Sequence, residues 1–104
     1  MILRVWKAWA TETGAEKYAE HYRNHVIDEL SSVVGFRRAQ LISRKYGEQV
    51  ELTSLVEFES MEVVRGFAKD DIERAVVAEA ARAVLERFDE RVTHYEILHD
   101  GQAR

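Results

Sequence analysis

The residues of this sequence best suited to chemistry are histidines, and two of them lie four positions apart. His21 and His25 fall in a stretch whose apolar residues recur at helical spacing. An imidazole ionises near neutral pH, so His25 is the predicted catalytic base, able to remove a proton from a bound molecule. Glu29 follows one helical turn later and could orient the ring. The alternative is that His25 and Glu29 are ordinary boundary residues that pair in solvent.

The same spacing of His21 and His25 would also suit two metal ligands on one helix. A tetrahedral site needs further protein ligands, and the sequence shows neither an HExxH pattern nor an obvious third ligand. The chain has no cysteine, which excludes disulfides and thiolate ligands. The sequence therefore predicts no metal site.

An N-terminal strand supplies a second group of candidates. Lys7 and Trp9 share one side of this strand with Leu3 and Val5, and we expect that side to pack under the helices. Lys7 could stabilise a substrate oxyanion there, or it could extend its ammonium group to the edge of the sheet. Trp6 would then face a second subunit as an interface anchor.

Aromatic residues elsewhere in the chain could complete a pocket for a flat molecule. Trp9 and Phe67 are the candidates for its walls, with plain core packing as the alternative for each. His94 alternates with Tyr95 on the last strand, so one of the two faces the helices and the other faces a presumed partner. The predicted pocket residues are Lys7, Trp9, Tyr22, Phe67 and His94.

The elements that position these residues can be read from changes of period. From Val50 to Phe58 the apolar residues alternate, which indicates a strand, and Met61 begins a helical spacing that Ser60 can cap. Thr13 and Glu16 form a capping box at the start of a long helix. Gly35 ends that helix in a left-handed turn. The predicted strands span 2–11, 36–46, 50–58 and 90–98, and the predicted helices span about 15–33, 61–69 and 72–88.

This order of elements, β-α-β-β-α-(α)-β, is the ferredoxin-like pattern of an α+β domain. We expect a four-stranded antiparallel sheet with the helices on one face, formed by residues 1–98, and a polar tail at 99–104. The strands are apolar on both sides, so the other face also needs a cover. A second copy of the chain is the predicted cover, which gives a homodimer.

Composition limits the classes of partner. The formal net charge is −4 with both signs interspersed, which argues against nucleic-acid binding. Apolar runs are much shorter than a bilayer span, so we expect no membrane insertion. The absence of cysteine fits a reducing cytoplasm.

With these elements in place, the chain resembles the antibiotic biosynthesis monooxygenase domain family, within the dimeric α+β barrel superfamily. The resemblance spans about residues 3–98. It is carried by the Val-Gly-Phe sequence at 34–36, the Phe-Glu-Ser and Val-Arg-Gly-Phe sequences within 58–67, and Val-Thr-His-Tyr-Glu at 92–96. The resemblance implies a homodimer whose sheets pack face to face, with a pocket in each subunit between sheet and helices.

The resemblance also implies an activity. Family members oxidise electron-rich aromatic molecules such as anthrones and quinols without a metal or flavin, so we expect a cofactor-independent monooxygenase acting on a reduced aromatic molecule. The haem-degrading branch has asparagine, tryptophan and histidine where this chain has Lys7, Phe67 and Val77. Haem degradation is therefore not expected. The alternative is a non-catalytic homodimer that binds a small apolar ligand, or a stress-related binding module.

Overall fold

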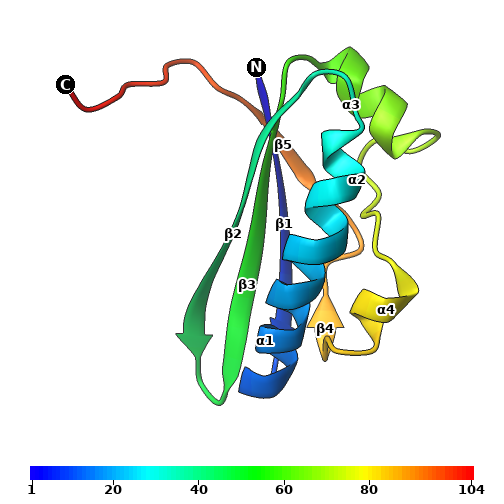
Figure 1. Cartoon of the computed structure of the whole chain (residues 1–104), viewed down its shortest axis with the longest axis vertical. Helices are drawn as coiled ribbons and strands as arrows, with labels where there is room; N and C mark the ends of the chain where they lie inside the picture. The colour runs from blue at the N-terminus through cyan, green and yellow to red at the C-terminus, as the bar shows by residue number, and fades with distance from the viewer.

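Three long strands make up most of the sheet (Figure 1). The computed structural model describes all of residues 1–104. Strand β3 (Gln49–Phe58) lies between β1 (Ile2–Ala10) and β2 (Phe36–Tyr46) and pairs antiparallel with both. The β2–β3 hairpin turns at Gly47, whose φ of 63° belongs to the left-handed region that glycine enters without strain. The predicted bounds of the second strand are confirmed.

The last strand is divided into two short pieces on the free edge of β1. Strands β4 (Arg87–Phe88) and β5 (Thr93–Glu96) both pair antiparallel with β1, so the sheet order is β2-β3-β1-β4, with β5 also on β1. The sheet is therefore antiparallel with five strands rather than four, and the α+β, ferredoxin-like prediction is confirmed. The continuous strand expected over 90–98 is shorter in the structure.

One long helix crosses the sheet in three consecutive parts: α1 (Glu12–His21), the π-helical η1 (Tyr22–Val26) and α2 (Ile27–Ser31). Its N-cap is Thr11 and not the predicted Thr13, because the Thr11 hydroxyl accepts the Gly14 N–H at 3.0 Å while Thr13 is already helical. The predicted left-handed turn at Gly35 is confirmed by its φ of 101°.

The region after β3 contains less helix than the sequence predicted. Helix α3 (Met61–Ala68) forms as expected, and the Ser60 hydroxyl caps it by accepting the Val63 N–H. The helix predicted over 72–88 is wrong: only α4 (Glu79–Arg82) forms there. Residues 73–75 form backbone hydrogen bonds with the segment before β5 in place of the hydrogen bonds of a helix. The Val92 N–H donates to the Glu73 carbonyl at 2.7 Å, and the Ala75 N–H donates to the Glu90 carbonyl at 2.9 Å.

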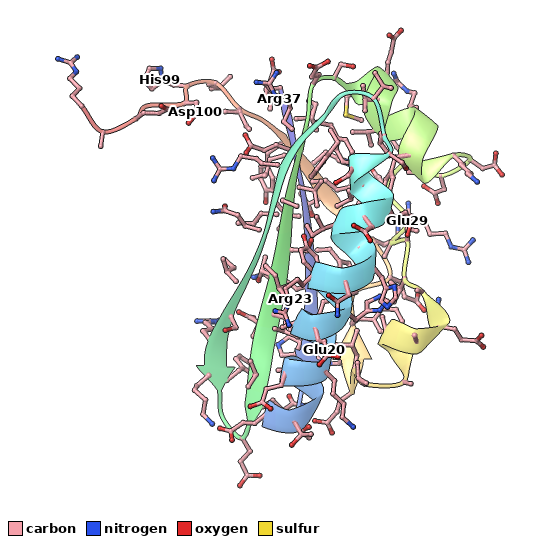
Figure 2. The ribbon with its side chains drawn as sticks, in the orientation of Figure 1. Glu20, Arg23, Glu29, Arg37, His99 and Asp100 are labelled. Carbon is pink, nitrogen blue, oxygen red and sulfur yellow. The ribbon has the colours of Figure 1, made fainter.

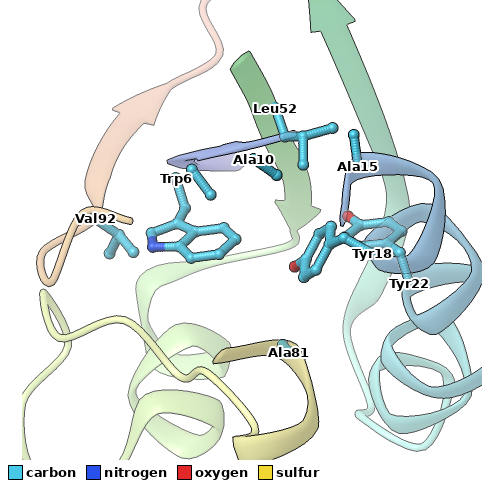
Figure 3. Close-up of a cluster of buried hydrophobic side chains, with 9 residues drawn as sticks. Trp6, Ala10, Ala15, Tyr18, Tyr22, Leu52, Ala81 and Val92 are labelled. Atoms are coloured by element: carbon cyan, nitrogen blue, oxygen red, sulfur yellow. The ribbon is translucent and has the colours of Figure 1, made fainter. Parts of the chain in front are cut away.

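All helices cover one face of the sheet, which we call the helix-covered face (Figure 1). Figure 3 shows Trp6, on β1, in the layer between the sheet and the helices. Tyr18 and Tyr22 of the long helix and Ala81 of α4 belong to the same cluster. Trp6 is 8% exposed, and its ring centroid lies 5.9 Å from that of Tyr18. Trp6 therefore packs under the helices, which corrects the prediction that it faces a second subunit.

The opposite surface of the sheet, which we call the open face, is not covered by any helix. It carries the alternate residues of each strand, namely Leu3, Val5, Lys7, Trp9, Arg38, Gln40, Ile42, Arg44, Glu51, Thr53, Leu55, Glu57, Thr93 and Tyr95. The prediction that Lys7 and Trp9 face the helices is wrong. The period of two correctly groups the residues of each side, but both sides of β1 are apolar enough to be the inner one.

The core consists of two clusters on the helix-covered face. One surrounds Trp6, Tyr18 and Tyr22, and the other packs Leu30, Val56, Phe58 and Val64 at the opposite end of the sheet. No helix is both long and apolar enough to span a bilayer. After β5 the chain leaves the sheet as an exposed segment without regular structure (Figure 1).

Candidate functional site

A cleft of about 430 Å³ lies between the long helix, α3 and the segment that carries α4. We call it the outer cleft. Nine of its twelve lining residues are hydrophobic, and Glu29, labelled on α2 in Figure 2, is its one carboxylate. The lining consists of Tyr18, His21, His25, Val26, Glu29, Leu30, Phe67, Val76, Val77, Ala78, Ala80 and Ala81.

A smaller space of about 70 Å³, the inner compartment, lies deeper, against the sheet. Five residues line both spaces, so only their side chains separate the two: Tyr18, Val26, Leu30, Phe67 and Val76. The remaining lining residues come mainly from the strands: Arg4, Trp6, Tyr22, Ser54, Val56 and Val92. The site is thus apolar at its centre and polar at its inner end.

The π-helical turn η1 lies in the wall of both spaces. Its extra residue replaces the usual bond with one from the Ile27 N–H to the Tyr22 carbonyl, five residues back. Tyr22 and Val26 reach the inner compartment, while His25 lines the outer cleft. Such turns are frequent at functional sites, and sequence periodicity alone did not indicate this one.

His25 lies in the cleft lining as predicted, next to His21. The two ring centroids are 5.3 Å apart, and His21 also packs against Tyr18. Burial, and next the charge of His25, lower the pKa of His21, while Glu29 acts in the opposite direction. These effects favour the neutral form of His21 and make it a weaker base, and the catalytic role of His25 stays a prediction.

Arg4 is the functional candidate that sequence reasoning missed. Its side chain lies on the helix-covered face, is 5% exposed and lines the inner compartment. The guanidinium donates to the Ile72 carbonyl at 2.7 Å and to the Arg74 carbonyl at 2.9 Å, and burial lowers its pKa to about 10. The sequence did contain a sign of this role, because Arg4 is a charged residue between Ile2 and Trp6 on one side of a strand.

His94 contacts Arg4 and does not line the site itself. Its Nε2 lies 3.0 Å from Arg4 Nη1, and because a guanidinium only donates, Nε2 must be the unprotonated acceptor. Burial, and next the charge of Arg4, lower the pKa of His94, with Glu73 opposing. His94 thus acts as a neutral support for Arg4, and it is not among the residues that line either space.

Two predicted pocket residues, Tyr22 and Phe67, do line the site. Tyr22 is buried, its hydroxyl lies 2.8 Å from Ser54 Oγ, and burial raises its pKa. Phe67 lines both spaces, and its ring lies 5.5 Å from the Arg4 guanidinium carbon. These residues place an aromatic wall and a hydroxyl beside the buried cation.

Lys7 and Trp9 are far from this arrangement, on the open face. Lys7 Nζ donates to Thr53 Oγ1 at 3.0 Å and lies 3.8 Å from Glu51 Oε2. The Arg87 guanidinium covers the Trp9 ring at 3.7 Å. The structure therefore contradicts two of the alternatives considered from the sequence: a pocket shared by Trp9 and Phe67, and an oxyanion role for Lys7 beneath the helices. No group of three or more His, Cys, Asp or Glu side chains is arranged to hold a metal ion.

Comparison with known proteins gives matches at the level of structure. No family model matches the sequence, and no curated protein matches it. A candidate antibiotic biosynthesis monooxygenase from Bacillus cereus superposes with a TM-score of 0.72 at 15% identity, covering 100% of this chain and 97% of that one. The monooxygenase of the ActVA-Orf6 gene of Streptomyces coelicolor, solved with nanaomycin D, gives 0.60 at 15% identity, covering 99% and 90%. The chain has an antibiotic biosynthesis monooxygenase-like fold.

Two further solved structures share this fold. A mutant of MhuD with two manganese protoporphyrin IX molecules per active site gives a TM-score of 0.63 at 18% identity, covering 99% of this chain and 100% of that one. A dimeric ferredoxin-like protein from an uncultured marine organism gives 0.63 at 14% identity, covering 98% of each chain. The predicted family resemblance is confirmed at the level of fold.

Proposed function

We propose that this protein is a cofactor-independent monooxygenase that oxidises a reduced, quinol-type or anthrone-type aromatic molecule in the outer cleft. The observation that carries the proposal is an apolar cleft of about 430 Å³ with two histidines on its wall, in a monooxygenase-like fold. Cavities of this size suit small ligands of several rings. Tyr18 and Phe67 offer aromatic surfaces for stacking.

The reaction needs little from the protein beyond proton transfer and a shaped cavity. His25 takes a proton from the substrate, and the electron-rich anion that remains transfers an electron to molecular oxygen. For an anthrone, the methylene group becomes a carbonyl with one oxygen atom, and the other leaves as water with the two hydrogens. The substrate supplies all four electrons, so no further reductant is required.

The proton that His25 takes leaves to water. The ring of His21 lies beside that of His25, but burial and the charge of His25 lower the pKa of His21, which makes it a poor proton acceptor. His25 is exposed, so the proton passes directly to solvent. In this proposal His25 is the base and His21 is a neutral neighbour in the cleft wall.

The proposed assembly is a homodimer through the open face. Ile42 and Tyr95 are about half exposed there, at 49% and 55%, and a structural neighbour with this fold is dimeric. Two such faces in contact would remove these side chains from water. Sedimentation of the wild type and of Leu55→Asp tests the assembly: the wild type should sediment as a dimer and the variant as a monomer. A monomeric wild type at micromolar concentration would contradict it.

Oxygen uptake with anthrones and quinols tests the activity. We expect uptake by the wild type and a loss of about 10²-fold or more in His25→Ala, the usual size of a general-base effect. His99→Ala is the matched control, because His99 lies in the C-terminal segment, away from the cleft (Figure 2). No uptake with any of these substrates, or equal rates for both variants, would remove the mechanism.

The second candidate function is ligand binding without turnover. The exposure of His25 favours it, since water competes for the proton of an exposed base. Native mass spectrometry separates the two functions: a retained and chemically unchanged ligand supports binding, and an oxidised product supports the enzyme.

A further inference from the structure

The inner compartment contains a buried cation without a counter-ion. Arg4 is 5% exposed, yet no carboxylate oxygen lies within 4.0 Å of its guanidinium, although seven ion pairs form elsewhere in the chain. A buried charge is costly unless it is paired, and the lowered pKa of Arg4 reflects that cost. The fold thus maintains a cation that its own acidic residues do not neutralise.

The guanidinium is also only partly satisfied by hydrogen bonds. It carries five N–H donors, and the protein supplies three partners: the Ile72 carbonyl, the Arg74 carbonyl and His94 Nε2. Two donors, on Nε and Nη2, have no protein partner, and Arg4 lines the inner compartment. The three protein bonds fix the plane of the guanidinium, so these two donors are held in a defined direction.

The surroundings of Arg4 favour an oxygen anion attached to an aromatic molecule. Apolar and aromatic residues line both spaces, and no acidic side chain lines the inner compartment. Phe67 and Val76 belong to the wall between the two spaces, so a molecule whose rings occupy the outer cleft brings a substituent to Arg4 when these side chains move aside. The net charge of −4 repels anions in general, so any preference for an anionic ligand has to come from this local site.

We propose that Arg4 binds an anionic oxygen of the ligand, a carboxylate or an ionised phenol, whose aromatic rings lie in the outer cleft. This inference rests on the proposed function for the position of the rings, and it adds the charge of the substrate and the residue that recognises it. Bidentate recognition of carboxylate or phenolate oxygen is the task for which arginine is suited. An ionised phenol at Arg4 would be the electron-rich form that oxygen attacks.

The first experiment compares two ligands that differ in charge and do not turn over. Binding of anthracene-2-carboxylate and of its methyl ester is measured by calorimetry at about pH 7.5, where the acid is ionised. We expect the wild type to bind the carboxylate at least about tenfold more tightly, and Arg4→Gln to lose this preference. Arg23→Gln is the matched control, because Arg23 is exposed on the helix and lines neither space (Figure 2).

Three outcomes of that experiment would overturn the inference. The first is that the wild type binds the ester as tightly as the carboxylate. The second is that folded Arg4→Gln keeps the preference for the carboxylate. The third is that the wild type binds neither probe at millimolar concentration. Circular dichroism shows whether the variant is folded.

The second experiment needs only the wild type and therefore stands even if Arg4→Gln does not fold. The absorbance of 4-nitro-1-naphthol reports its ionisation, and binding next to Arg4 should lower its apparent pKa by about one unit, a tenfold preference for the anion. A pKa that is unchanged or raised in the complex would overturn the inference. Because both experiments measure binding, anion preference without oxygen uptake would refute the activity alone, and uptake without anion preference would refute the role of Arg4 alone.

Discussion

The buried cation of the helix-covered face, Arg4, lacks the acidic partner that cations of the open face have. On the open face, Arg44 and Lys7 share Glu51, with Arg44 Nε at 2.7 Å and Lys7 Nζ at 3.8 Å, and Arg38 pairs with Glu57 at 2.9 Å. On the helix-covered face, Arg4 is far more buried and has no acidic partner. A cation neutralised by its own chain has a structural role, whereas a buried cation left without an anion is available to a ligand.

The largest expected difference between the faces concerns apolar packing. Phe58 is fully buried on the helix-covered face, so Phe58→Ala should lower the free energy of unfolding by about 3–5 kcal/mol at any protein concentration. Tyr95→Ala on the open face should cost less than about 1 kcal/mol in dilute protein and more once dimers form. Urea denaturation at two protein concentrations measures both. Equal losses in dilute protein would show that the faces do not differ in burial.

The next difference concerns the two cations themselves. Arg4→Met leaves two carbonyls and His94 without their charged donor, and should cost about 1–3 kcal/mol. Lys7→Met on the open face should cost less than about 1 kcal/mol, because Lys7 is partly exposed and Glu51 keeps its closer partner Arg44. Thermal unfolding of both variants with and without anthracene carboxylate sharpens the comparison: only Arg4→Met should lose stabilisation by the ligand. Loss of that stabilisation in Lys7→Met instead would reverse the roles of the two faces.

The smallest difference is in pH dependence. His94 on the helix-covered face has a lowered pKa, so the unfolded chain binds its proton more readily. Stability should therefore fall as the pH drops through about 6.5, the ordinary histidine pKa, and level off below the folded pKa of His94. The pKa of Glu51 on the open face is lowered, first by its bond from Arg44, so its contribution is lost only at more acidic pH, below its ordinary value of 4.5. Denaturation from pH 8 down to well below 4.5 measures both windows, and His94→Gln should reduce the upper one while the part due to His21, whose pKa is also lowered, remains.

The sequence predicted the strands and helices of this fold better than it predicted which side of a strand is covered and which distant residues pair. Alternation in β3 and the helical spacing after Ser60 depend on neighbouring residues, and both elements form as expected. The face of β1 was predicted wrongly, because residues on both sides of the strand are large and apolar. The helix expected over 72–88 is largely absent, because Glu73 and Ala75 form backbone hydrogen bonds with Val92 and Glu90. A local sequence pattern cannot predict bonds between residues that are so far apart in the chain.

The site was predictable in part for the same reasons. His25 lines the outer cleft, Tyr22 lines the inner compartment and Phe67 lines both, because helical spacing placed them on the sides of helices that face the site. Arg4 was missed because its importance depends on an absent partner, the carboxylate that no neighbouring strand or loop supplies. Lys7 was chosen instead, on the wrong side of the same strand.

The π-turn at Tyr22–Val26 has a mechanical consequence for the cleft wall. One additional residue shifts the angular phase of a helix by about 100°, so the two α-helical halves present faces that an uninterrupted spiral would not align. Deleting a single residue there would restore the regular pitch and rotate Tyr18 and His21 away from Leu30. The cleft wall therefore consists of two α-helical halves, α1 and α2, that differ in angular phase because of the π-turn between them. This difference in phase determines the shape of the wall.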